Sequence, residues 1–204
     1  YPSPHPLCIS LFLFQQQSPR SSFNCTQPPK LSADFDVSSC CRKPNLNLDS
    51  AREKCEAYIT AKWQRPNRTG TEEYPAYVHM CYPECIYRET GALVNEEIVL
   101  SGVQKFLESN MDRDDHGDVV PHIVKSFETC VENIKTHLKS MGLEKYALLP
   151  DGCSPYASLI FTCVNVETFL HCPAKLWKDE ENCNVSKSFV EQCNPLPHVP
   201  LPLQ

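Results

Sequence analysis

Apolar side chains recur at intervals of three and four residues through most of the chain between residues 49 and 193. Such spacing lines up side chains on one face of an α-helix, whereas a half-buried strand would alternate. The longest stripe consists of Val120, Ile123, Val124, Phe127, Val131, Ile134 and Leu138. A second stripe consists of Ile98 or Val99, Val103, Phe106 and Leu107. Residues 154–173 are apolar on almost all sides, which is typical of a central helix. The pattern predicts an all-α fold.

Capping residues and glycines predict the ends of the helices. Ser50 and Glu53 have the spacing of a capping box, which satisfies backbone N–H groups at a helix start. Pro75 suits a first helical turn, and Gly91 and Gly142 favour the left-handed conformation that ends a helix. The predicted helices span residues 49–65, 74–91, 95–110, 120–142 and 154–173, followed by short helices at 173–182 and 185–193.

Prolines are concentrated near the two ends of the chain, outside the predicted helical domain. Residues 1–24 contain a short apolar run like the core of a signal peptide, and we expect a leader-like or disordered segment there. Residues 194–204 are Pro-rich, which predicts a disordered tail. We expect one helical domain over 25–193, with an N-terminal arm (25–49), a core (50–172) and a C-terminal extension (173–193).

Composition and charge exclude several partners. The 204 residues carry a net charge of −6, with acidic and basic residues mixed along the chain and no basic stripe for nucleic acid. No Gly-rich phosphate loop and no apolar run of about 18–20 residues occurs. We therefore expect no nucleic-acid partner, no cofactor and no membrane span.

The 13 cysteines indicate an oxidising, extracellular destination. Cys81 and Cys85 lie one turn apart on the same face of a predicted helix, with Pro83 between them. A helix resists joining its own i and i+4 positions, so each thiol is free to hold a different segment. Two such cross-links offset the backbone bond that the proline removes.

Metal and catalytic sites are not indicated. Zinc sites usually bring two close Cys or His pairs, and this chain has a single Cys-x3-Cys pair. In an EF-hand alignment Asp112, Asp114 and Gly117 take positions 1, 3 and 6, but His116 takes position 5 and Ile123 replaces the bidentate Glu. A secreted phospholipase would need a Gly-rich calcium loop, which is absent. We expect no metal and no catalytic residue.

The cysteine spacing resembles that of the insect odorant-binding proteins. Cys55, Cys81, Cys85, Cys130, Cys163 and Cys172 are similar to that family's six-cysteine signature. The adjacent Cys40 and Cys41, the extra Cys153, Pro173 after Cys172, and the added Cys183 and Cys193 are similar to its Plus-C subclass. The resemblance covers about residues 40–193.

That resemblance implies the disulfides Cys55–Cys85, Cys81–Cys163 and Cys130–Cys172. The remaining cysteines of the expected domain are Cys25, Cys40, Cys41, Cys153, Cys183 and Cys193. Six cysteines allow 15 pairings, and 12 remain when a bond between the neighbours Cys40 and Cys41 is left out. We expect the arm and the extension to be joined to each other or to Cys153.

The resemblance also implies a secreted carrier, in sensillum lymph or another extracellular fluid, that reversibly binds small hydrophobic ligands in an apolar cavity without catalysis. An olfactory receptor is a candidate partner, and the carrier is a monomer or a homodimer. From the helical faces, we expect the ligand to contact Tyr77, Val99, Val103, Phe106, Phe127, Val131, Ile134, Leu138, Tyr156, Leu159, Ile160 and Phe169, with Tyr77 or Tyr156 as polar anchor. The alternatives are a secreted protein-interaction factor with a filled core, or a secreted hydrolase.

The sequence also contains candidate glycosylation sites and histidines that could respond to pH. Asn24, Asn67 and Asn184 head Asn-x-Ser/Thr sequons and are candidate glycosylation sites. His79, His122, His137 and His171 lie on or beside predicted helices, and histidine titrates near pH 6.5. Release of ligand on acidification is therefore a hypothesis, which equal affinity at pH 5 and pH 7.5 would eliminate.

Overall fold

The computed structural model describes residues 23–27, 29–32, 34–42, 46–63, 76–112, 117–149 and 152–193, without the side chains of residues 62, 63 and 76–79. This part of the chain is all-α, as predicted. Its helices are α1 (Asp49–Trp63), α2 (Ala76–Glu89), α3 (Leu100–Asn110), α4 (Val119–Ser140), α5 (Pro155–Leu170) and α6 (Glu181–Cys193), with a 3-10 turn, η1 (Val37–Ser39). The strands described are β1 (Leu93–Val94) and β2 (Glu97–Ile98), which pair antiparallel.

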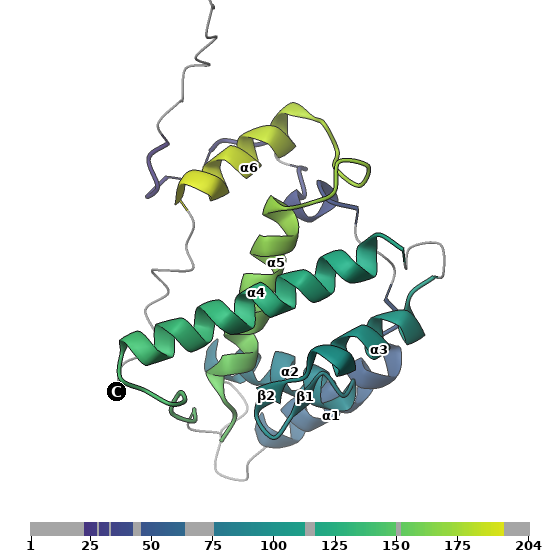
Figure 1. Cartoon of the computed structure of the whole chain (residues 1–204), viewed down its shortest axis with the longest axis vertical. Coiled ribbons are helices and arrows are strands. Elements are labelled where there is room, and N and C mark those ends of the chain that lie inside the picture. The colour runs from purple at the N-terminus through teal and green to yellow at the C-terminus, as the bar shows by residue number, and fades with distance from the viewer. Residues whose placement is uncertain are drawn as a thin grey trace, which may run out of the picture.

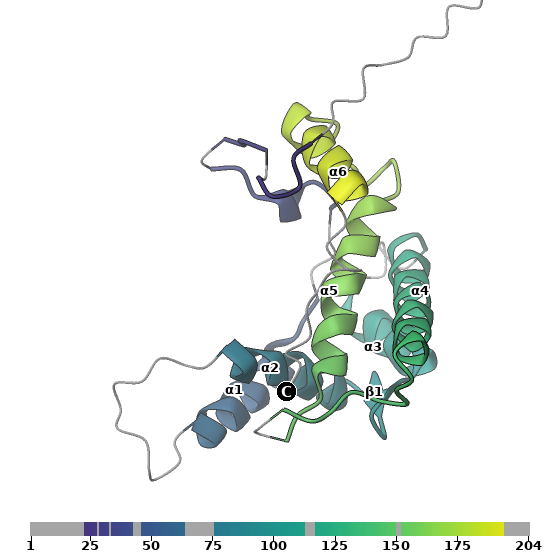
Figure 2. The same cartoon turned by 90° about the vertical axis from the view of Figure 1, so that its left-hand side faces the viewer.

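The long apolar helix α5 lies in the middle of the fold, as its sequence predicts. It packs against α2, α4 and α6. In Figures 1 and 2, α4 crosses α5 on one side, α1, α2 and α3 gather near its N-terminal end, and α6 lies beyond its C-terminal end. Ala157, Ile160 and Cys163 of α5 are at most 3% exposed, so this helix forms the spine of the core.

The ends of α2 and α4 follow the glycine prediction. Gly91 (φ +73°) and Gly142 (φ +70°) both have the left-handed conformation. After α4, the N–H of Leu143 donates to the carbonyl of Leu138 at 2.9 Å, which closes the helix in a Schellman arrangement. Helix α1 begins at Asp49, the predicted start, but Ser50 then lies inside its first turn and not at the N-cap of a capping box. Pro75 lies outside the described residues.

The start of α3 differs from the prediction. The chain forms the β1–β2 hairpin first, and α3 begins at Leu100 and not at Asn95. Asn95 (φ 51°) and Glu96 (φ 66°) occupy the two central positions of the turn, where two-residue hairpins require positive φ and Asn is favoured. A local turn preference thus replaced the first helical turn.

Of the two short helices expected after residue 172, the second lies within α6, whereas residues 173–180 form no helix. The chain first makes a turn in which the N–H groups of Leu176 and Trp177 donate to the carbonyl of Pro173, at 2.8 and 3.1 Å. Trp177 then forms an isolated antiparallel bridge with Cys41. This pairing with the arm keeps the segment before α6 from continuing as a helix.

Six disulfides cross-link the described residues, in a pattern that corrects two of the three expected core bonds. Cys55–Cys85 is confirmed. Cys81 pairs with Cys153 and Cys130 with Cys163, so the expected bonds Cys81–Cys163 and Cys130–Cys172 are wrong. Cys153 lies just before Ser154, the N-cap of α5, at the end of α5 that meets α2, so it is close to Cys81 of α2. Cys163 lies farther along α5, where this helix crosses α4, so it is close to Cys130 of α4.

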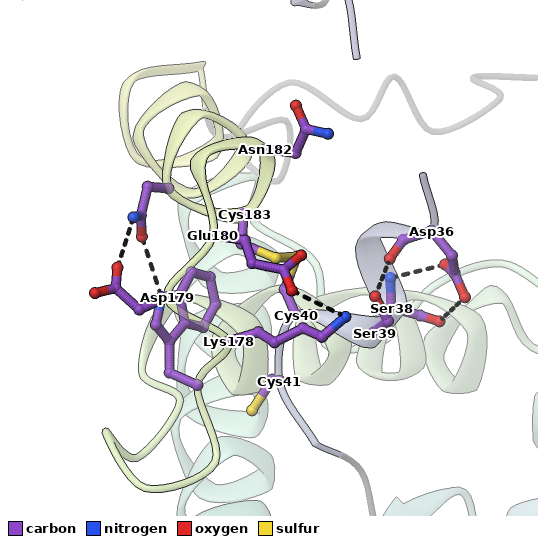
Figure 3. The surroundings of a disulfide bond; sticks show 12 residues. Asp36, Ser38, Ser39, Cys40, Cys41, Lys178, Asp179, Glu180, Asn182 and Cys183 are labelled. Carbon is purple, nitrogen blue, oxygen red and sulfur yellow. Dashed lines mark hydrogen bonds and ion pairs between the residues drawn. A yellow bond between two sulfur atoms is a disulfide. The ribbon is translucent and has the colours of Figure 1, made fainter. Parts of the chain in front are cut away.

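The arm is bonded to the C-terminal part of the chain at three points: Cys25–Cys193, Cys40–Cys183 and Cys41–Cys172. The expected link between arm and extension is therefore confirmed, while Cys153 takes no part in it. Figure 3 shows Cys40 bonded to Cys183 of α6 while the neighbouring Cys41 points away from that bridge. Phe23, just before the arm, also contacts α6, because its ring meets that of Phe189 edge to face at 5.6 Å.

Candidate ligand cavity

A cavity of about 510 Å³ lies between α1, α2, α3, α4, α5 and the arm. Its lining is mostly apolar and consists of Cys41, Arg42, Leu46, Leu48, Arg52, Tyr82, Pro83, Ile86, Tyr87, Ala92, Val103, Phe106, Leu107, Val119, His122, Ile123, Phe127, Phe161, Val164, Asn165, Thr168 and Leu176. The volume falls in the range of about 300–1,000 Å³ that is usual for small-molecule pockets.

Helix α2 contributes one wall of the cavity. Tyr82 and Ile86 are one turn apart on this helix, as are Pro83 and Tyr87, and all of them line the cavity. The cysteines of the same helix bind elsewhere: Cys85 bonds to Cys55 of α1 and Cys81 to Cys153. The two disulfides therefore fix α2 from one direction and leave the side that contains Pro83 facing the cavity.

The arm forms another wall, which the helical pattern did not indicate. Cys41, Arg42 and Leu46 all line the cavity. The Cys41–Cys172 disulfide holds this segment in place, and so does the N–H of Arg42, which donates to the carbonyl of Leu176 at 2.8 Å. The arm therefore closes a space that the helices alone would leave open.

The structure brings together some of the predicted ligand contacts. Val103, Phe106 and Phe127 line the cavity. Ile134, Leu138 and Ile160 instead belong to the packed core, and Val131, Tyr156 and Leu159 pack against it. Val99 and Phe169 do not line the cavity either. Val99 is the N-cap of α3, and the ring of Phe169 packs against that of Trp177 at 5.5 Å. The side chain of Tyr77 lies outside the described residues. The stripes identify inward faces, but not the place where neighbouring helices separate.

Tyr87 is the buried tyrosine of the cavity wall. Its side chain is 8% exposed, and its ring meets that of Phe127 edge to face at 5.6 Å. Burial raises the pKa of the Tyr87 hydroxyl, so the group stays protonated and can donate a hydrogen bond. Burial also raises the pKa of Tyr156, to about 12, but this residue is not part of the lining. Among the tyrosines, Tyr87 therefore suits the role of polar anchor better than the predicted Tyr156.

The polar part of the lining contains positive but no negative groups. Arg42 and Arg52 are exposed at the edge of the cavity. His122 is half-buried, and its Nε2 lies 3.2 Å from the carbonyl oxygen of Thr168. Of the other predicted histidines, His137 and His171 are exposed, and the side chain of His79 lies outside the described residues. No Asp or Glu lines the cavity within the described part of the chain.

A second, polar crevice lies between α1, α3 and the end of α2, and it shares Phe106 with the apolar cavity. Lys54 and Glu89 form an ion pair there at 2.9 Å, and Asn47, Ser109 and Asn110 contribute further polar groups. Because its lining is hydrophilic, this crevice suits water better than an apolar molecule. Phe106 lines both spaces and separates them.

Metal-ligand clusters and membrane-spanning helices are both absent from the described ranges. No group of at least three His, Cys, Asp or Glu side chains there is placed to hold a metal ion. None of the helices described is both long and apolar enough to cross a bilayer. Asp114 and His116, from the EF-hand alignment, lie outside these ranges.

The sequons differ in their surroundings. Asn24 is exposed, and its Oδ1 accepts from the hydroxyl of Thr26 at 2.8 Å. The Asn184 amide is engaged on both sides, because Oδ1 accepts from the Trp177 indole at 3.1 Å and Nδ2 donates to Asp179 at 2.8 Å. Asn67 lies outside the described residues. Asn24 is therefore the better placed of the two described sequons.

Comparison with known proteins bears on the family. No family model matches the chain. The chain is 25% identical over 157 residues to general odorant-binding protein 67 of Anopheles gambiae. The matched region covers 76% of this chain and 72% of that protein. It is also 25% identical over 166 residues to odorant-binding protein 47 of the same organism, and this match covers 78% of this chain and 69% of that protein. With the cysteine spacing and the cross-linked helical fold, these distant relatives support membership of the insect odorant-binding protein family.

Proposed function

We propose that this protein is a carrier that reversibly binds small hydrophobic molecules, such as odorants, pheromones or similar lipophilic ligands, and solubilises them in an extracellular fluid without changing them chemically. The observation that carries the proposal is the apolar cavity of about 510 Å³ enclosed by five helices and the arm. The names of the two relatives agree with it. Secretion, the Plus-C subclass and the single domain over 25–193 are part of the same proposal, as are the olfactory receptor as partner and the monomeric or homodimeric state.

The disulfides explain how a domain of this size can keep such a space. Void volume lowers stability by about 24 cal/mol per Å³, so an empty cavity of about 510 Å³ costs up to about 12 kcal/mol. That cost is comparable to the entire stability of an ordinary domain. Each disulfide contributes about 2–4 kcal/mol, so several cross-links are needed to hold the helices around an unfilled centre.

The apolar walls also supply the driving force for binding. Burying apolar surface contributes about 25 cal/mol per Å², and Val103, Leu107 and Phe127 offer such surface deep in the molecule, where each is at most 6% exposed. Tyr87 adds one hydroxyl for orientation. A lining of this kind favours molecules with an apolar body and few polar groups.

Displacement of a hydrophobic fluorescent probe, such as N-phenyl-1-naphthylamine, tests the proposal. We expect terpene-sized or aliphatic ligands to displace the probe at micromolar concentrations. Val103→Trp should weaken probe binding, because the larger side chain occupies part of the cavity. Val94→Trp is the matched control, since Val94 is 48% exposed and lies outside the cavity. A wild-type protein that binds no probe, with its six disulfides intact by mass, would favour the protein-interaction factor instead.

A further inference from the structure

We propose that the cavity selects apolar chains with an anionic head group over neutral ones of the same length. The inference rests on the proposed carrier function and names the class of ligand. It starts from a contrast of charge: the chain has 25 acidic and 19 basic residues, yet the described lining contains Arg42 and Arg52 and no carboxylate. The wall of the cavity has the opposite sign to the protein as a whole.

Arg52 is well placed to meet a charged head group. It lies in the first turn of α1, is exposed, and shares the cavity lining with Leu48 and Tyr82. Neighbouring cations are already paired, Lys54 with Glu89 and Arg88 with Glu84. Arg52 makes no ion pair with any described residue. Its guanidinium is therefore available to a ligand.

Arg42 places a second guanidinium on the same lining. The residue belongs to the arm, and the bond from its N–H to the carbonyl of Leu176 fixes its backbone beside the cavity. Its exposed side chain keeps the charge in water, where a cation is stable. Both arginines thus lie at the boundary between solvent and the apolar interior.

This arrangement matches an amphipathic anion. A charged head cannot enter the apolar interior without a large desolvation cost, so it must stay at the rim while its chain enters the cavity. A guanidinium presents a planar fork of donors that fits a carboxylate or a phosphate. A neutral odorant gains nothing from these two charges.

The size of the preference is limited by the surroundings. Asp49, Glu53 and Glu56 are exposed on α1 near Arg52, although they do not line the cavity. Solvent and these carboxylates weaken the attraction, so the pair should behave as a partly exposed ion pair worth up to about 1 kcal/mol. We therefore expect an anion to bind about fivefold tighter than a neutral ligand of the same chain length.

Calorimetry or probe displacement with dodecanoate, dodecyl phosphate and 1-dodecanol tests this inference. We expect either or both anions to bind about fivefold tighter than the alcohol at low salt, and the difference to shrink in concentrated salt. Arg52→Gln and Arg42→Gln should reduce this preference, singly or together, by weakening the binding of the anions more than that of 1-dodecanol. Lys139→Gln, which removes an exposed charge outside the lining, is the control and should change neither affinity.

The outcomes separate the two proposals. Equal affinity for all three ligands would overturn the anion selectivity. A preference that survives in the double arginine variant would overturn the role of Arg42 and Arg52 in it. Both results would leave the carrier function standing. Failure of all three ligands and of the fluorescent probe to bind would overturn the carrier function itself. A preference for phosphate over carboxylate, or the reverse, identifies which anionic head group the rim accepts.

Discussion

Gly102 in α3 provides a sharp test of how the helices around the cavity are held. A Cβ added at this position would overlap the carbonyl oxygen of Gly91 and lie 3.0 Å from its carbonyl carbon and 3.5 Å from the Cα of Ala92. All three are backbone atoms. The Gly91–Ala92 segment cannot retreat easily, because the N–H of Val99 donates to the carbonyl of Ala92 at 2.9 Å, which ties it to the start of α3.

Two effects of Gly102→Ala oppose each other. Alanine is the better helix former by about 0.8–1 kcal/mol, which would stabilise α3. Overpacking against a fixed neighbour costs about 1–3 kcal/mol, and more when nothing can relax. Because the overlap is with a carbonyl group and not with a flexible side chain, we expect the clash to win. The net loss should be about 1–2 kcal/mol, or a lower melting temperature by about 2–8 °C.

Thermal unfolding followed by circular dichroism measures the effect, with the disulfides intact. Ser101→Ala is the control, because Ser101 is the adjacent exposed residue of α3 and its Cβ already exists. We also expect Gly102→Ala to weaken probe binding, because Val103 and Phe106 line the cavity from the same helix. A variant as stable as Ser101→Ala, or more stable, would refute the close approach of α3 to Gly91.

Two further predictions concern the arm and alkaline pH. Removing the Cys41–Cys172 bond with serines should destabilise the fold by about 2–4 kcal/mol and weaken probe binding, since Cys41 lines the cavity; removing Cys25–Cys193, which does not, should lower stability while leaving probe affinity nearly unchanged. Burial raises the pKa of Tyr156 from 10.0 to about 12, so its neutral form contributes stability that is complete below pH 10 and lost as the pH rises toward 12. Urea unfolding between pH 9 and about 12 should therefore show a shallower loss in Tyr156→Phe than in the wild type, and identical pH profiles would contradict the assignment.

The helices and their ends follow from local properties of the chain. Periods of three and four residues within 120–141 require one face of a helix to be buried, whatever it packs against. Gly91 and Gly142 end helices because their left-handed backbone conformation costs glycine little. The number and spacing of the cysteines likewise indicate an oxidised, cross-linked domain from the sequence alone.

Disulfide partners and cavity walls depend on distances between segments, which local patterns do not contain. Eight residues lie between Cys163 and Cys172, and nine lie between Cys153 and Cys163, so spacing alone could not decide which pair completes the core set. The arrangement of α5 decided it, by placing Cys163 at α4 and Cys172 at the arm. In the same way Phe127 and Ile134 share one helical stripe, but only Phe127 lies where α4 stands apart from its neighbours. A helical face is a property of its own sequence, whereas a cavity exists only where several faces fail to meet.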